Sequence, residues 1–220
     1  MKSSGAKGMF FRAGAHMAED GLFGRVRRFV SDRRGVAAVE FAFVAPLLLA
    51  MYFVTMEVSQ GIEANKKVGR IGSMVADLIT QQPNVDLKDV KAIMDIGQSI
   101  LQPYTRTRPT ITVTAIEITY KPSISVKVAW SVKMENGVYT TPFKKGDATI
   151  LPEELMFDQD SVDKAFLIRV NSELAYRPVI TWSAADKPAL GLAAAFDGIS
   201  MGETYYLRPR IKDRIDCTGC

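Results

Sequence analysis

The stretch RRGVAAVEFAFVAPLLLAMYFV, residues 33–54, decides how this chain is organised. The apolar run within it extends from Val36 to Met56, and Glu40 is its only charged residue. A helix over these residues would be ~30 Å long at ~1.5 Å per residue, which matches the hydrocarbon core of a bilayer. The sequence therefore predicts a transmembrane helix over residues 36–56.

Two other interpretations of the apolar run fit less well. A buried helix of a soluble protein is seldom apolar on every side. A cleaved secretory signal has an apolar region of about 7 to 15 residues that ends in a small-residue site. Here the run is longer and passes directly into Glu57 without such a site. A membrane anchor that stays in the chain is the better interpretation.

The charges on the two sides of the run predict its orientation. Residues 1–34 hold eight basic and three acidic residues, whereas the rest of the chain holds 20 basic and 21 acidic ones. A basic flank keeps its side of a membrane helix in the cytoplasm, so Arg33 and Arg34 mark the cytoplasmic side. Residues from about 57 onward are then expected in the periplasm, anchored in the inner membrane. Because the basic tail adjoins a membrane segment, no nucleic-acid partner is expected.

Apolar spacing predicts helices after the membrane run. Residues 1–35 read as a basic, disordered leader, and residues 57–103 read as a stalk helix followed by a second helix. The stalk is expected to end at Gln82, before Pro83, and to bend at its glycines. Asn84 or Asp86 is expected to cap the second helix. The apolar residues expected to form the stalk's buried stripe are Val58, Ile62, Val68, Ile71, Val75 and Leu78.

Residues 104–220 change to strand character. Segments 111–120 and 123–134 alternate small or apolar with polar residues and are rich in β-branched residues. Asn136-Gly137 is a hairpin signal before a further strand over 138–143. Residues 164–176 and 178–182 are expected to form a strand pair or one long bent strand, and residues 203–210 a final strand, with 189–199 as a helix or a loop. The fold class expected is α+β: one transmembrane helix that continues into an amphipathic stalk, then a mainly antiparallel sheet domain outside the cytoplasm.

Few residues in this sequence could support catalysis. The only histidine, His16, precedes the apolar run, which excludes Ser-His and Cys-His nucleophiles from the outer domain. No glycine-rich nucleotide loop follows a strand, so no cofactor is expected. The acids within residues 153–163 do not have EF-hand spacing, and they read as a solvated loop rather than a metal site. Cys217 and Cys220 are compatible with a local disulfide or with two free or intermolecular thiols.

Glu40 is the residue that asks for an explanation. A carboxylate costs ~2.5–3.5 kcal/mol at the centre of a membrane helix and less near the interface. One account places Glu40 near the headgroups, within reach of Arg33 or Arg34. The other account is that a second chain supplies a positive charge. The energy alone does not distinguish these accounts.

The residues around Glu40 resemble a known signal. Arg33-Arg34-Gly35 followed by Val36-Ala37-Ala38-Val39-Glu40 and an apolar run resembles the class III signal of type IV pilins and pseudopilins. More closely, the segment resembles the start of the TadE family and its TadG-like relatives, which are pseudopilin-type proteins of the tight-adherence (Flp pilus) system. GRIGSMVADLITQQ (69–82) and TYYLRPR (204–210) with a late cysteine resemble later parts of that family.

This resemblance implies a processing site and a set of partners. A prepilin-type peptidase would cut after Gly35, Val36 would become the first residue, and Glu40 would be the fifth. The new α-amine, with a pKa of ~7.7–8.0, would be cationic at neutral pH and would meet the glutamate of a neighbouring subunit. Other pilins or pseudopilins, the secretion platform and inner-membrane lipid are the remaining partners implied.

Three hypotheses for function follow. The first is a non-enzymatic protein: a minor pseudopilin or membrane-anchored periplasmic factor for assembly of Flp-type pili. The second is an uncleaved single-pass sensor or ligand-binding module. The third is an anchored hydrolase that uses acids between Glu153 and Asp163, which would need a cleft joining two of those carboxylates.

Overall fold

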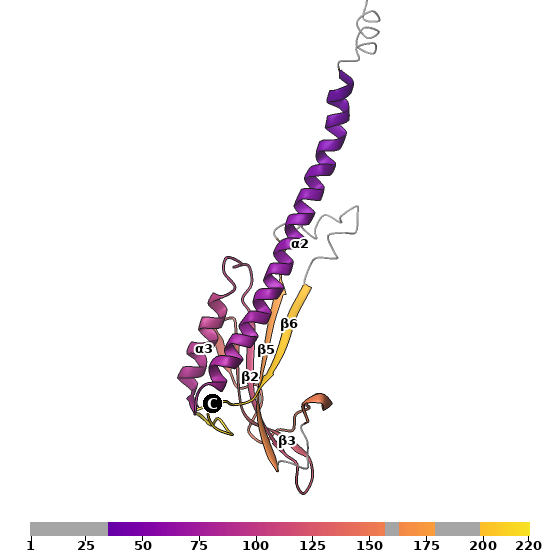
Figure 1. Cartoon of the computed structure of the whole chain (residues 1–220). Coiled ribbons are helices and arrows are strands. Elements are labelled where there is room, and N and C mark those ends of the chain that lie inside the picture. Colours follow the sequence, from indigo (N-terminus) through magenta and orange to yellow (C-terminus); the bar gives the residue numbers. More distant parts are fainter. Residues whose placement is uncertain (1–34, 157–162, 179–198) are drawn as a thin grey trace, which may run out of the picture. The chain divides into compact units, whose positions relative to one another are not determined.

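The computed structural model describes residues 35–156, 163–178 and 199–220 (Figure 1). The chain divides into two compact units, Met1–Phe53 and Val54–Cys220, and each is described by itself. The predicted leader up to residue 34, with Arg33 and Arg34, lies outside the described residues. So do most of the predicted strand over 178–182 and all but the last residue of 189–199.

Helix α2, Val36–Thr80, is the longest element of the chain. Its part in the first unit exposes large apolar side chains on all sides; Phe41 and Phe43 are 70% and 77% exposed. Pro46 lies inside this part of the helix, where it cannot donate a backbone hydrogen bond. Among the described residues, α2 is the one helix that is long and apolar enough to cross a membrane.

The second unit contains the rest of α2, and here the buried face differs from the predicted stripe. Val68, Ile71 and Val75 are buried as expected, but Val58 and Ile62 are exposed, and Leu78 is only half-buried. The buried face instead contains small and polar residues at its N-terminal end, which selection by apolarity alone passes over. In chain order it consists of Glu57, Ala64, Val68, Gly69, Ile71, Gly72, Val75, Ala76, Ile79 and Thr80.

The stalk glycines, at which the sequence predicts bends, allow close packing against the sheet. A Cβ atom at Gly72 would lie 2.8 Å from both Ser172 Oγ and Tyr205 Cδ2, and one at Gly69 would lie 3.1 Å from the Tyr205 hydroxyl. The Ser172 hydroxyl also donates to the Val68 carbonyl at 2.9 Å. The helix therefore lies against the sheet where it has no side chain, and it continues without interruption to Thr80, two residues before the predicted end.

Helix α3, Leu87–Ser99, is the predicted second helix, and Asp86 is its cap. The Asp86 carboxylate accepts from the Asp89 N–H at 2.7 Å, and the Asp89 carboxylate accepts from the Asp86 N–H at 3.3 Å. This reciprocal capping box satisfies two of the helix's otherwise unpaired N–H groups. Val90, Met94 and Gly97 face the core, and Gly97 lets α3 approach α2 closely at Val75 and Ile71.

Five strands form the antiparallel sheet, in the order β4-β3-β2-β5-β6. Asn136 and Gly137 have φ angles of 52° and 80°, so they form the predicted hairpin turn between β3 and β4. A bulge at Ala115/Ile116 shifts the register of β2 against β3. The strands are β2 Thr110–Thr119, β3 Ser125–Glu135, β4 Val138–Thr140, β5 Lys164–Tyr176 and β6 Ile199–Leu207.

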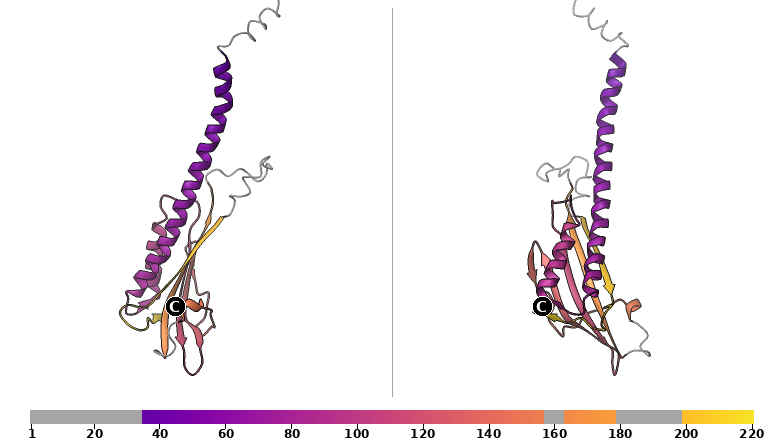
Figure 2. Two further views of the ribbon diagram at one scale, coloured as in Figure 1. Left: turned by 45° about the vertical axis from the view of Figure 1, so that its right-hand side comes forward. Right: turned by 60° about the vertical axis from the view of Figure 1, so that its left-hand side comes forward.

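The two faces of the sheet pack differently. The helices of the second unit cover one face (Figure 2), where Val113 of β2 and Val170 of β5 are fully buried. On the other face Ile116, Ile118 and Leu167 form a smaller core with Tyr120 and Leu151. The confirmed α+β fold therefore has its main core between the helices and the sheet.

The sequence prediction places strand β6 too late in the chain. Strand β6 begins at Ile199 and ends at Leu207, whereas the prediction was residues 203–210. Its ending has a visible cause: the Arg210 N–H donates to the Thr80 carbonyl at 2.9 Å, so the chain leaves β5 and caps the end of α2. The prediction used the alternation of apolar residues, which cannot reveal a hydrogen bond between distant residues.

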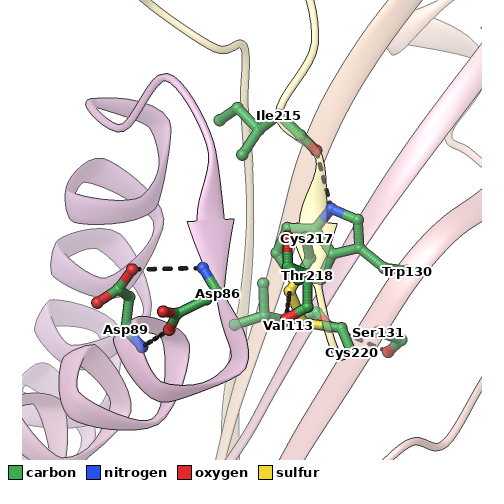
Figure 3. Close-up of a disulfide and its surroundings, with 9 residues drawn as sticks. All are labelled: Asp86, Asp89, Val113, Trp130, Ser131, Ile215, Cys217, Thr218 and Cys220. Atoms are coloured by element: carbon green, nitrogen blue, oxygen red, sulfur yellow. Dashed lines mark hydrogen bonds between the residues drawn. A yellow bond between two sulfur atoms is a disulfide. The ribbon is translucent and has the colours of Figure 1, made fainter.

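The C-terminal segment returns to the start of α3 (Figure 3). Strand β7, Cys217–Thr218, pairs in parallel with β1, Val85–Asp86, an element that the sequence did not predict. Trp130 Nε1 donates to the carbonyl of the fully buried Ile215 at 2.9 Å. Cys217 and Cys220 form a disulfide within this segment. The C-terminus is thus attached to the sheet and to α3 at once.

Candidate processing and assembly site

The residues of the predicted processing site lie at the start of α2. The helix begins at Val36, directly after Gly35, and both residues are exposed. A Cβ atom at Gly35 would have no neighbour within 4 Å. Val36 and Glu40 are four residues apart, so they lie on the same side of the helix, about one turn from each other. Glu40 is exposed, and among the described residues none forms a hydrogen bond or ion pair with it.

A second carboxylate, which the sequence analysis did not single out, lies just after the apolar run. Glu57 is only 8% exposed, and its Oε1 accepts a hydrogen bond from the Tyr176 hydroxyl at 2.6 Å. The Tyr176 ring stacks on Tyr104, with ring centres 5.4 Å apart. A buried carboxylate needs such a donor because its desolvation is costly. The end of β5, backed by the loop after α3, therefore contacts α2 at Glu57, the residue that follows Met56.

Arg106 completes this arrangement. Its guanidinium donates to Gln60 Oε1 at 3.3 Å and to the Arg177 carbonyl at 3.0 Å. It also lies over the Tyr104 ring, 5.4 Å from its centre. We call this group the junction cluster. Its members are Glu57, Gln60, Tyr104, Arg106 and Tyr176.

A signal for the junction cluster was present in the sequence. Val68, Ala64 and Glu57 are buried and Gly61 is half-buried, and helical steps of three or four residues separate these positions. Extending the stripe backwards from Val68 by those steps reaches Glu57 through only two small residues, Ala64 and Gly61. A glutamate on the buried face of an amphipathic helix predicts a hydrogen-bond donor opposite it. The sequence could not show that Tyr176 is that donor, since the two residues are 119 positions apart.

The junction cluster makes folding sensitive to alkaline pH. Burial, and next the hydrogen bond to Glu57, raise the pKa of Tyr176 from 10.0 to about 12, although nearby Arg106 opposes this. Below pH 10 both states keep the phenol protonated. Between pH 10 and about 12 the unfolded chain releases the proton and the folded chain does not. Stability is therefore expected to be full below pH 10 and to fall as pH rises through this window.

This dependence can be tested with Tyr176→Phe. The full-length variant is expected to lose less stability than the wild type between pH 10 and 12, because its side chain has no proton to release. Urea unfolding at several pH values, followed by tryptophan fluorescence, measures the slope. Tyr139, whose pKa is also raised to about 12, mainly by burial and then by Asp95, gives a matched comparison through Tyr139→Phe. Equal slopes in wild type and Tyr176→Phe would contradict the role of Tyr176.

The segments that carry the sequence resemblance after the membrane run meet in the structure. Asp77, in residues 69–82, forms an ion pair of 2.5 Å with Arg210, in residues 204–210. Tyr205, from the later segment, packs against Gly69 and Gly72 of the earlier one. These residue types are therefore explained by the packing of α2 on β6.

The predicted acidic group over residues 153–163 is only partly within the described residues. Glu153 and Glu154 lie on the short 3-10 helix η2, Glu153–Leu155, while residues 157–162 are outside the described part of the chain. Asp163 forms an exposed ion pair of 3.0 Å with Lys121. Within the described residues, no three His, Cys, Asp or Glu side chains gather as a metal site would require.

The fold and the exposed apolar helix define the class of this protein: an α+β sheet domain with, in the part of the chain that the structure describes, one candidate membrane span. Residues 35–69 match the model of one family, described as TadE-like protein. The match begins at Gly35 and includes both Glu40 and the start of the junction cluster, so the predicted resemblance is confirmed over this segment. No curated protein and no solved structure matches the chain. A TadE-like domain fits a protein associated with the tight-adherence pilus.

Proposed function

We propose that this protein is a minor pseudopilin, or a membrane-anchored periplasmic factor, for assembly of tight-adherence pili. The observation that carries the proposal is the family match, which starts at Gly35 and contains Val36 and Glu40 in the order of a class III signal. In this proposal the leader lies in the cytoplasm, α2 crosses the inner membrane, and the sheet domain lies in the periplasm. The protein acts by binding other subunits and not by catalysis.

In this proposal, processing supplies a positive charge for Glu40. A prepilin-type peptidase hydrolyses the bond between Gly35 and Val36, which leaves a carboxylate on Gly35 and a free amine on Val36. That amine is largely protonated at neutral pH. Glu40 then binds the amine of a neighbouring pilin or pseudopilin, so both charges are neutralised in a region where unpaired charge is costly. The exposure of Val36, Glu40 and the surrounding apolar side chains supports such a contact between chains.

The test is the N-terminal residue and mass of the protein recovered from membranes of its own host. A chain that begins at Val36 is expected. A Gly35→Leu variant is expected to stay full-length, and since a Cβ atom at position 35 would have no neighbour within 4 Å, its fold should be unchanged. A wild-type chain that begins at Met1 would contradict processing and leave only the anchored factor.

A further inference from the structure

Strand β6 forms an open edge of the sheet. It is the last strand in the order β4-β3-β2-β5-β6 (Figure 1), and among the described residues no strand pairs with its outer side. All nine of its residues pair with β5 without a shift in register. Every second residue of such a strand directs its backbone N–H and C=O groups away from the sheet, where they can bind another strand.

The opposite edge of the sheet is covered. Strand β4 pairs with the end of β3, and nearer the start of β3 the Val128 N–H donates to the Asp147 carbonyl at 2.9 Å. Edge strands are commonly protected from other chains by short length, proline, lysine or a bulge. Strand β6 has none of these features in its sequence ISMGETYYL, whose only charged residue is Glu203. This edge is therefore suited to pair with a further strand.

The side of α2 that faces β6 exposes apolar side chains. A Cβ atom at Gly69 would lie 3.1 Å from the Tyr205 hydroxyl and 3.7 Å from Glu203 Cγ, so this side of the helix faces β6. Ile62 precedes Gly69 by seven residues, about two turns, and Val58 lies about one turn further back. Both belong to the second unit and are 53% and 43% exposed. We call Val58 and Ile62 the apolar flank of α2.

The side chains of β6 on its helix-facing side define the chemistry of a partner strand. The apolar ones, which pack against the main core, are Ile199, Met201, Tyr205 and Leu207. Glu203 follows the same alternation and is exposed, and none of the ion pairs within the described residues includes it. Opposite charges on neighbouring strands stabilise a sheet, and like charges destabilise it. The matching strand therefore has apolar residues at alternate positions and a lysine or arginine beside Glu203.

A second copy of this chain fits the edge less well. Within the second unit α2 and β6 run in the same direction, since Gly61 lies near Met201 and Gly69 near Tyr205. Antiparallel pairing of two β6 edges would set the two α2 helices antiparallel, whereas two chains anchored in one membrane with the same orientation need them parallel. Parallel pairing would turn the second sheet over, so that the face of its β6 that holds Thr204 would meet the apolar flank. The better occupant is a strand of a different protein.

We propose that the β6 edge and the apolar flank of α2 bind an extended segment of a partner subunit as a further strand of the sheet. Backbone hydrogen bonds hold the segment at the edge, its alternate apolar side chains contact Val58 and Ile62, and its basic side chain pairs with Glu203. The inference rests on the proposed function only for the partner's being another subunit. Binding itself involves the second unit alone, so it does not depend on processing at Gly35.

The experiment uses labelled synthetic peptides and the full-length protein in a neutral detergent. In the first peptide threonine and valine alternate, with lysine in place of the third valine, which matches β6 in parallel; the reversed sequence matches it in antiparallel orientation. Fluorescence anisotropy measures binding, and wild type is expected to bind one of these peptides. The same peptide with proline at its central threonine is expected not to bind, because it loses a backbone N–H that the edge requires.

Variants on the exposed surface test the two kinds of side-chain contact. Ile62→Ser is expected to weaken binding about tenfold, because an apolar contact is lost. Ile96→Ser is the matched control, since Ile96 lies on α3 and is 52% exposed. Glu203→Lys is expected to weaken binding of the lysine peptide about tenfold and to bind a peptide with glutamate in place of lysine more tightly than wild type does. An unfolded domain could not produce that rescue.

Three outcomes would overturn the proposal. The first is that neither lysine peptide binds, or that the proline peptide binds equally well. The second is equal binding by wild type and Ile62→Ser. The third is self-association of the full-length chain that Ile62→Ser abolishes, which would make a second copy the occupant. A chain that is processed at Gly35 but binds no peptide would contradict this inference alone, whereas an unprocessed chain that binds peptide would contradict only the processing.

Discussion

Alanine at position 40 is expected to abolish pilus assembly while the protein remains in the membrane. In the proposed assembly, Glu40 neutralises the new amine of a neighbouring chain, and its removal leaves that amine unpaired in a poorly solvated region. A charge costs ~2.5–3.5 kcal/mol at the centre of a membrane helix and less near its end, where Glu40 lies, so the loss in the association constant has an upper limit of about a few hundredfold. Glu40→Asp is expected to retain part of the assembly, since it keeps the charge on a shorter side chain.

The amount of pili shed from host cells that carry each variant measures this effect. Immunoblots compare the level of the protein in the membranes. Val39→Ala is the matched control, because Val39 is also exposed on the same turn of α2 and the change leaves the carboxylate in place. Loss of pili in Glu40→Ala but not in Val39→Ala would support the contact between chains. Equal piliation in wild type and Glu40→Ala would remove Glu40 from the mechanism.

Local signals in the sequence predicted most of the sheet and the second helix correctly. Asn136-Gly137 marks its turn because both residues adopt positive φ, and Asp86 caps α3 through its own side chain. Such features depend on a few neighbouring residues, so they can be read without knowing the fold. The same holds for the apolar run of α2, whose length alone indicates a membrane span.

Contacts between distant residues could not be predicted in the same way. The parallel pairing of β7 with β1 involves two residues from each segment, too few for a periodic pattern. The buried face of α2 was assigned one position off at its start, since Val58 is apolar yet exposed while Glu57 is charged yet buried. Burial of Glu57 is determined by Tyr176, and no local rule in the sequence connects these residues.

Substitution of a glycine in α2 is expected to give the second large effect, a loss of stability. The sequence predicts bends at these glycines, whereas the structure shows them in close packing with the sheet. Leucine at position 72 is expected to destabilise the second unit by about 3 kcal/mol, since its Cβ alone would lie 2.8 Å from Ser172 Oγ and from the Tyr205 ring. The hydroxyl could move only by giving up its bond to the Val68 carbonyl. A domain of this size has only about 5–15 kcal/mol to lose.

The same alanine substitution at two glycines separates packing from helix propensity. Alanine favours a helix over glycine by about 1 kcal/mol. At Gly61 the nearest atom to a new Cβ would be Met201 Cε at 3.8 Å, an ordinary contact, so Gly61→Ala is expected to stabilise the protein. At Gly72 the two close contacts outweigh that gain, and Gly72→Ala is expected to destabilise it. Urea unfolding of the full-length variants measures both signs. If both alanine variants were more stable than wild type, the close packing of α2 on β5 and β6 would not require glycine at position 72.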